Sequence, residues 1–149
     1  MSYYAQSTEL SFDLPDSGLT RAQGGFGEDD GEAVIGRWVQ RDTEDTVKLL
    51  LADARPFGVI TRLSSGKVAV AVGSILRGKR GSDTVIGVGN RVTGDTRKES
   101  ATGNAEPGFV KAGGTSTVTH VLSSEGYVIS EDVASTADTP ASYVDVVMR

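Results

Sequence analysis

The fold is decided between Pro56 and Thr93 by three short apolar runs: Phe57-Gly58-Val59-Ile60, Gly66-Lys67-Val68-Ala69-Val70-Ala71-Val72-Gly73 and Thr84-Val85-Ile86-Gly87-Val88-Gly89. Valine and isoleucine favour the pleated, half-buried surface of a sheet. Glycines inside such runs mark bends and bulges. The pattern therefore predicts a β-protein made of short strands.

Further strands are expected on both sides of this stretch. Leu10, Phe12 and Leu14 alternate with polar residues, which is typical of a strand with one apolar face. A bulge is expected at Gly36 within the strand 33–41. The expected strands are 10–14, 33–41, 84–93 and 143–148, together with a hairpin of 57–63 and 67–76 and a hairpin of 115–122 and 127–130. Between them we expect a turn at 42–45, a basic turn at 77–81 and a polar loop at 95–108.

Residues 47–53 fit two patterns. Val47, Leu50, Leu51 and Ala54 have helical spacing, with Thr43 as a possible N-cap. A helix this short is marginal, and both flanks are β, so we expect a strand.

Two regions are expected. Residues 1–32 read as an extended N-terminal arm, because glycines and acidic residues surround one short apolar pattern. Such a segment buries too little of itself to repay its ordering entropy, so it is mobile or ordered by a partner. Residues 33–149 read as a small β-barrel or sandwich, because eight or so strands are separated by turns about every ten residues.

The inventory of reactive residues argues against an enzyme. The chain has no cysteine and one histidine, His120, which lies inside an expected strand with no neighbouring triad pattern. The acidic cluster 28–32 lacks the spacing of a calcium loop, and Gly87, Gly89 and Gly94 do not match the dinucleotide fingerprint. We therefore expect no catalytic residue, no metal and no cofactor.

The charges are segregated along the chain, whose net charge is −5. Residues 1–32 hold seven acids and one base, residues 62–98 hold eight bases and two acids, and residues 99–149 hold seven acids and two bases. These segments either pair, within a subunit or between subunits, or form separate solvated faces.

The excess of acids disfavours nucleic acid as a partner. One basic group is a candidate for phosphate contact, but no aromatic residue that would stack a base lies near it in the sequence. Its members are Arg77, Lys79, Arg80, Arg91, Arg97 and Lys98.

No window holds the 18 or so apolar residues of a membrane span, and the N-terminus lacks a basic stretch followed by an apolar one. We therefore expect a soluble protein that does not bind a membrane.

Several of these segments together resemble the small capsid decoration, or cement, proteins of tailed bacteriophages. The resemblance covers about residues 33–148 and rests on valine and glycine patterns. Asn90 stands where the family more often has aspartate, and the 94–107 loop is long for it. The segments that carry it are Arg55-Pro56-Phe57-Gly58-Val59-Ile60 with 66–73, Val88-Gly89-Asn90-Arg91-Val92-Thr93 with Gly108-Phe109-Val110-Lys111-Ala112, and Glu125-Gly126-Tyr127-Val128-Ile129 with Val144-Asp145-Val146-Val147.

The resemblance implies a β-barrel or β-tulip-like module that forms a homotrimer on the outer surface of a virion. Its partner would be the major capsid protein, whose subunits it bridges, and it would carry no catalytic residue. On this view the arm contacts the capsid, and the strand 10–14 adds to a coat-protein sheet edge. The contact residues expected on the arm are Tyr3, Tyr4, Leu10, Phe12 and Leu14.

Two other functions stay open. The chain is alternatively another phage structural module, such as a tail or baseplate domain, or an oligonucleotide-binding β-barrel without catalysis. A small hydrolase or lyase is the third possibility, and it would depend on His120.

Overall fold

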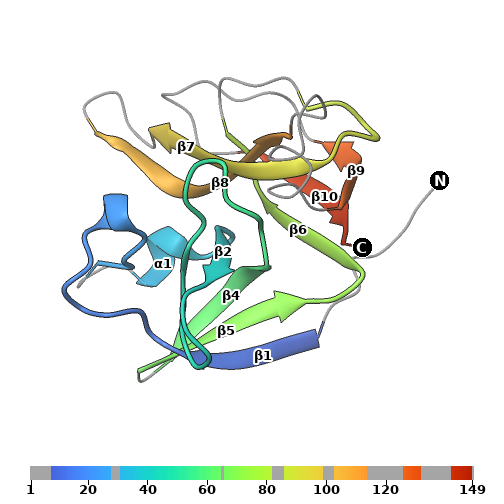
Figure 1. Cartoon of the computed structure of the whole chain (residues 1–149). Helices are drawn as coiled ribbons and strands as arrows, with labels where there is room; N and C mark the ends of the chain where they lie inside the picture. Colours follow the sequence, from blue (N-terminus) through green and yellow to red (C-terminus); the bar gives the residue numbers. More distant parts are fainter. Residues whose placement is uncertain are drawn as a thin grey trace.

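A computed structural model describes residues 8–27, 31–64, 66–81, 86–98, 103–113, 126–131 and 142–148. The described part is mainly β, with antiparallel sheets and no closed barrel. Figure 1 shows the strands crossing one another in a small domain. The only helical segments in these ranges are short: η1 (Arg21–Gln23), a 3-10 turn, and α1 (Gly31–Val34).

The largest sheet has five strands in the order β1-β5-β4-β2-β3, with every neighbouring pair antiparallel. β4 and β5 form its central hairpin, and β1 and β3 are its edges. The strands are β1 (Thr8–Asp13), β2 (Trp38–Arg41), β3 (Val47–Leu49), β4 (Gly58–Ser64) and β5 (Lys67–Val72).

This sheet curls so that its two edges touch at one end. Asp13, at the end of β1, forms a parallel bridge with Thr46, and its N–H donates to the carbonyl of Asp45 at 2.8 Å. One face of the curled sheet encloses an apolar core. The buried residues of this core are Phe12, Phe26, Val34, Val39, Val47, Leu49, Ile60, Val68 and Val70.

Two smaller sheets pack against the other face. The three-stranded sheet has the order β6-β10-β9, and β7 pairs with β8. A second core, which contains Trp38 and Ala71 from the large sheet, lies between these layers. The strands are β6 (Ile75–Lys79), β7 (Val92–Lys98), β8 (Ala105–Ala112), β9 (Tyr127–Glu131) and β10 (Tyr143–Val147).

Several expectations are confirmed. The 57–63 and 67–76 runs form the β4–β5 hairpin, Val47–Leu49 is a strand rather than a helix, and the last strand is β10. The 67–76 run is divided, because the chain leaves the large sheet after Val72 and enters the small one at Ile75. Residues 114–125, which include the expected strand 115–122, lie outside the described residues.

Four local expectations are wrong. Residues 33–41 begin in the helical turn α1, and Gly36 (φ 85°) lies in the turn before β2 rather than in a bulge. The expected basic turn 77–81 belongs mostly to β6. The expected strand 84–93 gives way to a tight turn at 87–90, where the N–H of Gly87 binds the Asn90 side chain. The expected loop 95–108 is largely the β7–β8 hairpin.

The segment expected to be a separate arm takes part in the fold where it is described. β1 pairs with β5 over six residues, from Thr8 opposite Val72 to Asp13 opposite Lys67. Phe12 and Phe26 both enter the core enclosed by the large sheet. Partners within the same chain therefore order residues 8–27.

Candidate binding surface

The edge strand β1 and the loop that follows it form the candidate binding surface. β1 is the outermost strand of the large sheet, beside β5 (Figure 1). Thr8, Glu9 and Ser11 are exposed, and so are Leu10 and Leu14, at 41% and 40%. An edge strand presents unpaired backbone groups to which another strand can pair. Two of the expected contact residues, Leu10 and Leu14, thus lie where a partner can reach them.

Phe12 does not lie on this surface. Its side chain is 8% exposed and belongs to the core. Its ring meets that of Phe57 edge to face, with centroids 5.8 Å apart, and the Arg41 guanidinium lies 5.1 Å from its centre. The sequence predicts that Phe12 contacts the capsid, but these neighbours cover its ring, which holds β1 in place. Tyr3 and Tyr4 lie outside the described residues.

A polar brace ties β1 to the sheet across β5. The Thr61 hydroxyl donates to one carboxylate oxygen of Glu9 at 2.8 Å, and Arg62 donates to the other at 3.3 Å. Lys67 forms an ion pair with Asp13. Alanines at positions 69 and 71 of β5 lie opposite Ser11 and Glu9, and their small side chains leave room for the Glu9 side chain to reach β4.

Hydrogen bonding within this brace shifts two pKa values. The Thr61 hydroxyl, together with the charge and hydrogen bond of Arg62, lowers the pKa of Glu9 below its ordinary value of 4.5. The hydrogen bond and charge of Asp13 raise the pKa of Lys67 above its ordinary value of 10.5. Both shifts favour the charged form of the group.

A groove opens beside the loop after β1, with a volume of about 520 Å³. Its lining combines apolar side chains with the hydroxyls of Ser17 and Thr20 and the Asp16 carboxylate. The lining residues are Leu14, Pro15, Asp16, Ser17, Gly18, Leu19, Thr20, Phe26 and Gly27.

Local hydrogen bonds shape the groove. Asp16 accepts from the N–H of Gly18 through its side chain and from that of Leu19 through its carbonyl, at 2.9 and 3.0 Å. Thr20 and Gln23 then form a capping box around η1. Gly25 packs directly on the Leu19 backbone, where a β-carbon would come within 2.9 Å of the Leu19 carbonyl carbon. These contacts therefore hold the turn that lines the groove.

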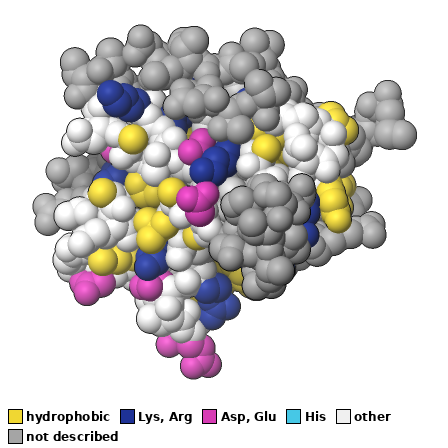
Figure 2. All heavy atoms as spheres, turned by 45° about the horizontal axis from the view of Figure 1, so that its top comes forward, with side chains coloured by type: hydrophobic (Ala, Val, Ile, Leu, Met, Phe, Trp, Pro, Cys, Tyr) yellow, Lys and Arg dark blue, Asp and Glu magenta, His cyan; other side chains and the backbone are white. Residues whose placement is uncertain are grey.

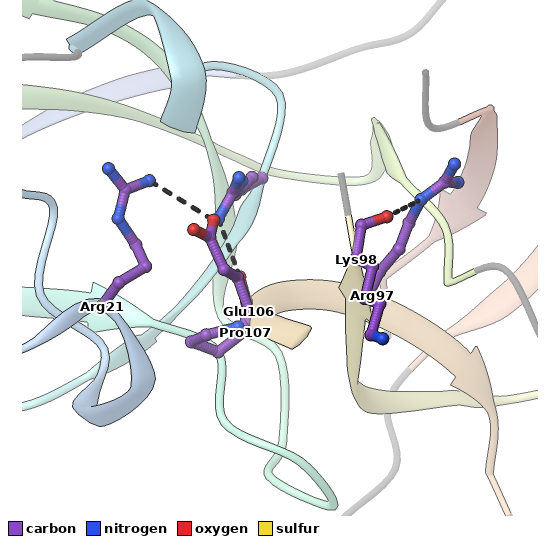
Figure 3. A network of polar contacts seen from close by, with 6 residues as sticks. Arg21, Arg97, Lys98, Glu106 and Pro107 are labelled. Atoms are coloured by element: carbon purple, nitrogen blue, oxygen red, sulfur yellow. Dashed lines mark hydrogen bonds and ion pairs between the residues drawn. The ribbon is translucent and has the colours of Figure 1, made fainter. Parts of the chain in front are cut away.

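A buried arginine network anchors this loop to the β7–β8 sheet (Figure 3). The Glu106 carboxylate lies 2.7 Å from the buried guanidinium of Arg37 and 3.8 Å from that of Arg21 in η1. Arg37 also donates to the Pro107 carbonyl at 3.3 Å, and its guanidinium lies 5.0 Å from the Phe109 ring centre. Glu106 thus links η1 to the interior of the domain. The sequence carried no signal for this link, because Glu106 falls in a stretch that reads as a polar loop.

The basic group noted in the sequence does not form one patch. Arg80 and Arg97 are buried, at 2% and 1% exposed. Arg77 makes a bidentate pair with the buried carboxylate of Asp145, at 2.8 and 2.9 Å. On the described surface seen in Figure 2, acidic, basic and apolar side chains are interspersed. This arrangement offers no broad cationic track for a nucleic-acid backbone on that face.

Charges from distant parts of the chain meet within the subunit. The acidic N-terminal segment pairs with the basic middle through Glu9–Arg62 and Asp13–Lys67, and the middle pairs with the acidic C-terminal part through Arg77–Asp145. At least some of the oppositely charged segments therefore pair within one subunit.

The described residues contain no cluster of three or more histidine, cysteine, aspartate or glutamate side chains that would hold a metal ion. His120 and the acidic residues 28–30 lie outside the described ranges, and nothing in the structure bears on them. The described surface offers a strand edge, exposed apolar side chains and ion pairs as means of binding.

Comparison of the chain with protein-family models, with curated proteins and with solved structures found no match in any of the three. Among the described residues, no helix has the length and apolar content needed to cross a bilayer.

Proposed function

We propose that the chain is a structural virion protein without catalytic activity, which binds the outer surface of a phage capsid as a homotrimer and bridges coat subunits. The observation that carries the proposal is the exposed edge of β1, with exposed leucines at positions 10 and 14. Ion pairs to β4 and β5 hold this strand on the sheet. A strand from a coat protein would pair with this edge and gain backbone hydrogen bonds, while the two leucines would fix its register.

The brace supports this role. A strand that serves as a template for another chain binds more tightly when it is ordered beforehand, because less entropy is lost on binding. Six register pairs with β5, the buried ring of Phe12 and the two ion pairs hold β1 in one conformation. The groove at the end of β1 would accept an apolar side chain of the partner.

The segments behind the resemblance also support the proposal. The runs around Val59 and Val70 form the β4–β5 hairpin, those around Val92 and Val110 form β7 and β8, and those around Val128 and Val146 form β9 and β10. Each pair of segments that resembles the decoration proteins thus forms two adjacent antiparallel strands. We extend the proposal to a tulip-like or sandwich module, in which the curled sheet packs on the two smaller ones.

Co-sedimentation with capsid shells that lack the decoration layer tests the proposal. We expect the wild-type chain to pellet with the shells and to have the mass of a trimer in solution. The double variant Leu10→Asp, Leu14→Asp places one charge on β1 and one on the loop that follows it, and it is expected to stay in the supernatant. Val88→Asp is the matched control, because Val88 is an exposed apolar residue (71%) outside β1 and its loop.

Each outcome has a distinct meaning. A wild-type chain that never pellets contradicts the capsid function. Equal pelleting of the double variant and the wild type contradicts the β1 surface but leaves the capsid function. Removing residues 1–7 leaves β1 intact, so loss of binding in that variant assigns the contact to this segment, and Tyr3→Ala with Tyr4→Ala then tests the two tyrosines. Salt-dependent binding to single-stranded DNA, or an activity lost in His120→Ala, would favour the alternatives.

A further inference from the structure

β1 is docked as a separable unit. Its contacts outside its own residues are chiefly with β5, and it lies at the periphery of the domain (Figure 1). Phe12 is the one residue of β1 that is buried. The other links are side-chain pairs at the surface and the hydrogen bond from Asp13 to Asp45. The strand-pairing, ring, ion-pair and hydrogen-bond partners of β1 lie between residues 41 and 72, and the core that Phe12 enters also contains Phe26, Val34 and Val39.

A second anchor holds the chain after β1. The N–H of Leu49 donates to the Gly24 carbonyl at 2.8 Å, and Phe26 is buried at 6% exposure. Between the two anchors lie residues 14–20, most of which are exposed and line the open groove. For β1 to leave β5 while Gly24 and Phe26 stay in place, the chain would have to turn within this segment, and the hydrogen bonds of Asp16 to Gly18 and Leu19 would have to open.

We propose that β1 exchanges between copies of this chain, so that β1 of one copy pairs with β5 of a second copy. The contacts made in the exchanged form are the same as those made within one copy. The free energies of the two forms therefore differ only through residues 14–20 and the cost of association. Head-to-tail exchange of this kind closes a ring when the rotation between successive copies divides a full turn, and every copy in such a ring would place its exchanged β1 equivalently around the symmetry axis.

The docking site is specific for the β1 sequence, which is why a second copy is the occupant. It demands an aromatic side chain between Phe57 and Arg41, and carboxylates opposite Arg62 and Lys67. β1 supplies these groups as Phe12, Glu9 and Asp13 in one six-residue register. Copies of the chain would associate in this way whether or not the chain binds a capsid.

Engineered disulfides test the exchange cleanly, because the chain has no cysteine of its own. Ser11 on β1 lies opposite Ala69 on β5. Directly opposed residues of antiparallel strands have the Cα separation that a disulfide needs. A tagged Ser11→Cys chain and an untagged Ala69→Cys chain are unfolded, mixed, refolded together at high concentration and oxidised. The tag distinguishes the mixed dimer from both homodimers on a non-reducing gel.

Two controls accompany the mixture. The first replaces Ala69→Cys by Thr96→Cys, an exposed position on β7 in another sheet. The second is the single chain with both Ser11→Cys and Ala69→Cys, refolded at high dilution, where the disulfide must form within the chain if the register is as described.

We expect the mixed dimer of Ser11→Cys with Ala69→Cys to exceed that with Thr96→Cys several-fold, and its yield to fall on dilution. A mixed dimer no more abundant than in the Thr96→Cys control, while the double variant closes within one chain, would overturn the exchange. Failure of the double variant to close would also overturn it, because the proposal requires the Ser11–Ala69 register.

Discussion

The indole ring of Trp38 packs directly on the backbone of Gly78 and thereby joins the large sheet to the three-stranded one. Trp38 lies on β2 and is fully buried, and its Nε1–H donates to the Lys79 carbonyl at 3.1 Å. A β-carbon built on Gly78 would overlap the ring, with Cζ2 at 2.9 Å and two other ring atoms closer still. The layers therefore approach this closely only because residue 78 lacks a side chain.

Gly78→Ala is expected to destabilise the domain by about 1–3 kcal/mol, because the extra methyl group overpacks a full core. Urea unfolding followed by the fluorescence of Trp38, the only tryptophan, measures the loss. Gly18→Ala is the matched control, since its β-carbon would meet only the Asp16 side chain, with Oδ1 at an ordinary 3.5 Å. Equal unfolding midpoints for Gly78→Ala and the wild type would contradict the described layer packing.

The Arg77–Asp145 pair across β6 and β10 is expected to stabilise the domain more than an exposed pair does. The Asp145 side chain is only 4% exposed, and both of its oxygens accept from Arg77. A double-mutant cycle with Arg77→Ala and Asp145→Ala should give a coupling of about 1.5–3 kcal/mol, the range for hydrogen bonds to charged groups.

Glu9 and Arg62 provide the comparison for this cycle. Their side chains are 44% and 67% exposed, so the coupling from Glu9→Ala and Arg62→Ala should be clearly weaker than that of the Arg77–Asp145 pair. Similar couplings for the two pairs would show that the burial of Asp145 contributes nothing.

Truncation of Phe12 and truncation of Leu10 are expected to lower the free energy of unfolding by very different amounts, although both residues belong to β1. Phe12→Ala removes a buried ring from between Phe57 and Arg41, and we expect a loss of about 3 kcal/mol. Leu10→Ala truncates a side chain that is 41% exposed and should cost less than about 1 kcal/mol. Urea unfolding of the two variants checks the order, and a reversed order would place Phe12 on the surface instead.

The brace predicts a defined pH dependence of stability at acid pH. The folded-state pKa of Glu9 is lowered, so its contribution is fully present above the ordinary 4.5 and is lost as pH falls through the lowered value. Thr61→Ala should move the pKa of Glu9 upward, because Thr61 is the largest cause of the shift. An NMR titration of the Glu9 side chain measures this directly, and an unchanged pKa in Thr61→Ala would contradict it.

The contribution of Lys67 to stability changes with pH in the opposite direction, in the alkaline range. Its folded-state pKa is raised, so its contribution is present below the ordinary 10.5 and is lost as pH rises through the raised value. Asp13→Asn removes the largest causes of the shift, so the variant should be less stable than the wild type at neutral pH and should lose less stability as pH rises through the alkaline range. Unfolding midpoints measured across the alkaline range compare the two proteins.

The sequence was sufficient where local pattern decides structure. The β4–β5 hairpin follows from valines at alternate positions around a serine–glycine turn, and β10 follows from the final valine run. β8 could not be predicted, because Pro107 and Gly108 lie inside it and normally interrupt strands. Burial of Phe109 and Val110 in the interior, against residues distant in sequence, keeps this segment extended.

The candidate surface was predictable only in part. The alternation of Leu10, Phe12 and Leu14 predicted a strand with one apolar face, and β1 confirms the strand. The alternation could not show that Phe12 is covered while Leu10 and Leu14 stay exposed. The residues that cover Phe12 are Phe57 and Arg41, which are about 30 to 45 positions away along the chain. The Arg21–Glu106–Arg37 network was invisible for the same reason.

An electron-microscopy map of capsids incubated with the chain tests the central proposal most directly. We predict density for trimers on the outer capsid surface, with the free edge of β1 against a strand of the coat protein and Leu10 and Leu14 at the contact. An outer surface without added density, or density in which β1 faces solvent, would contradict it.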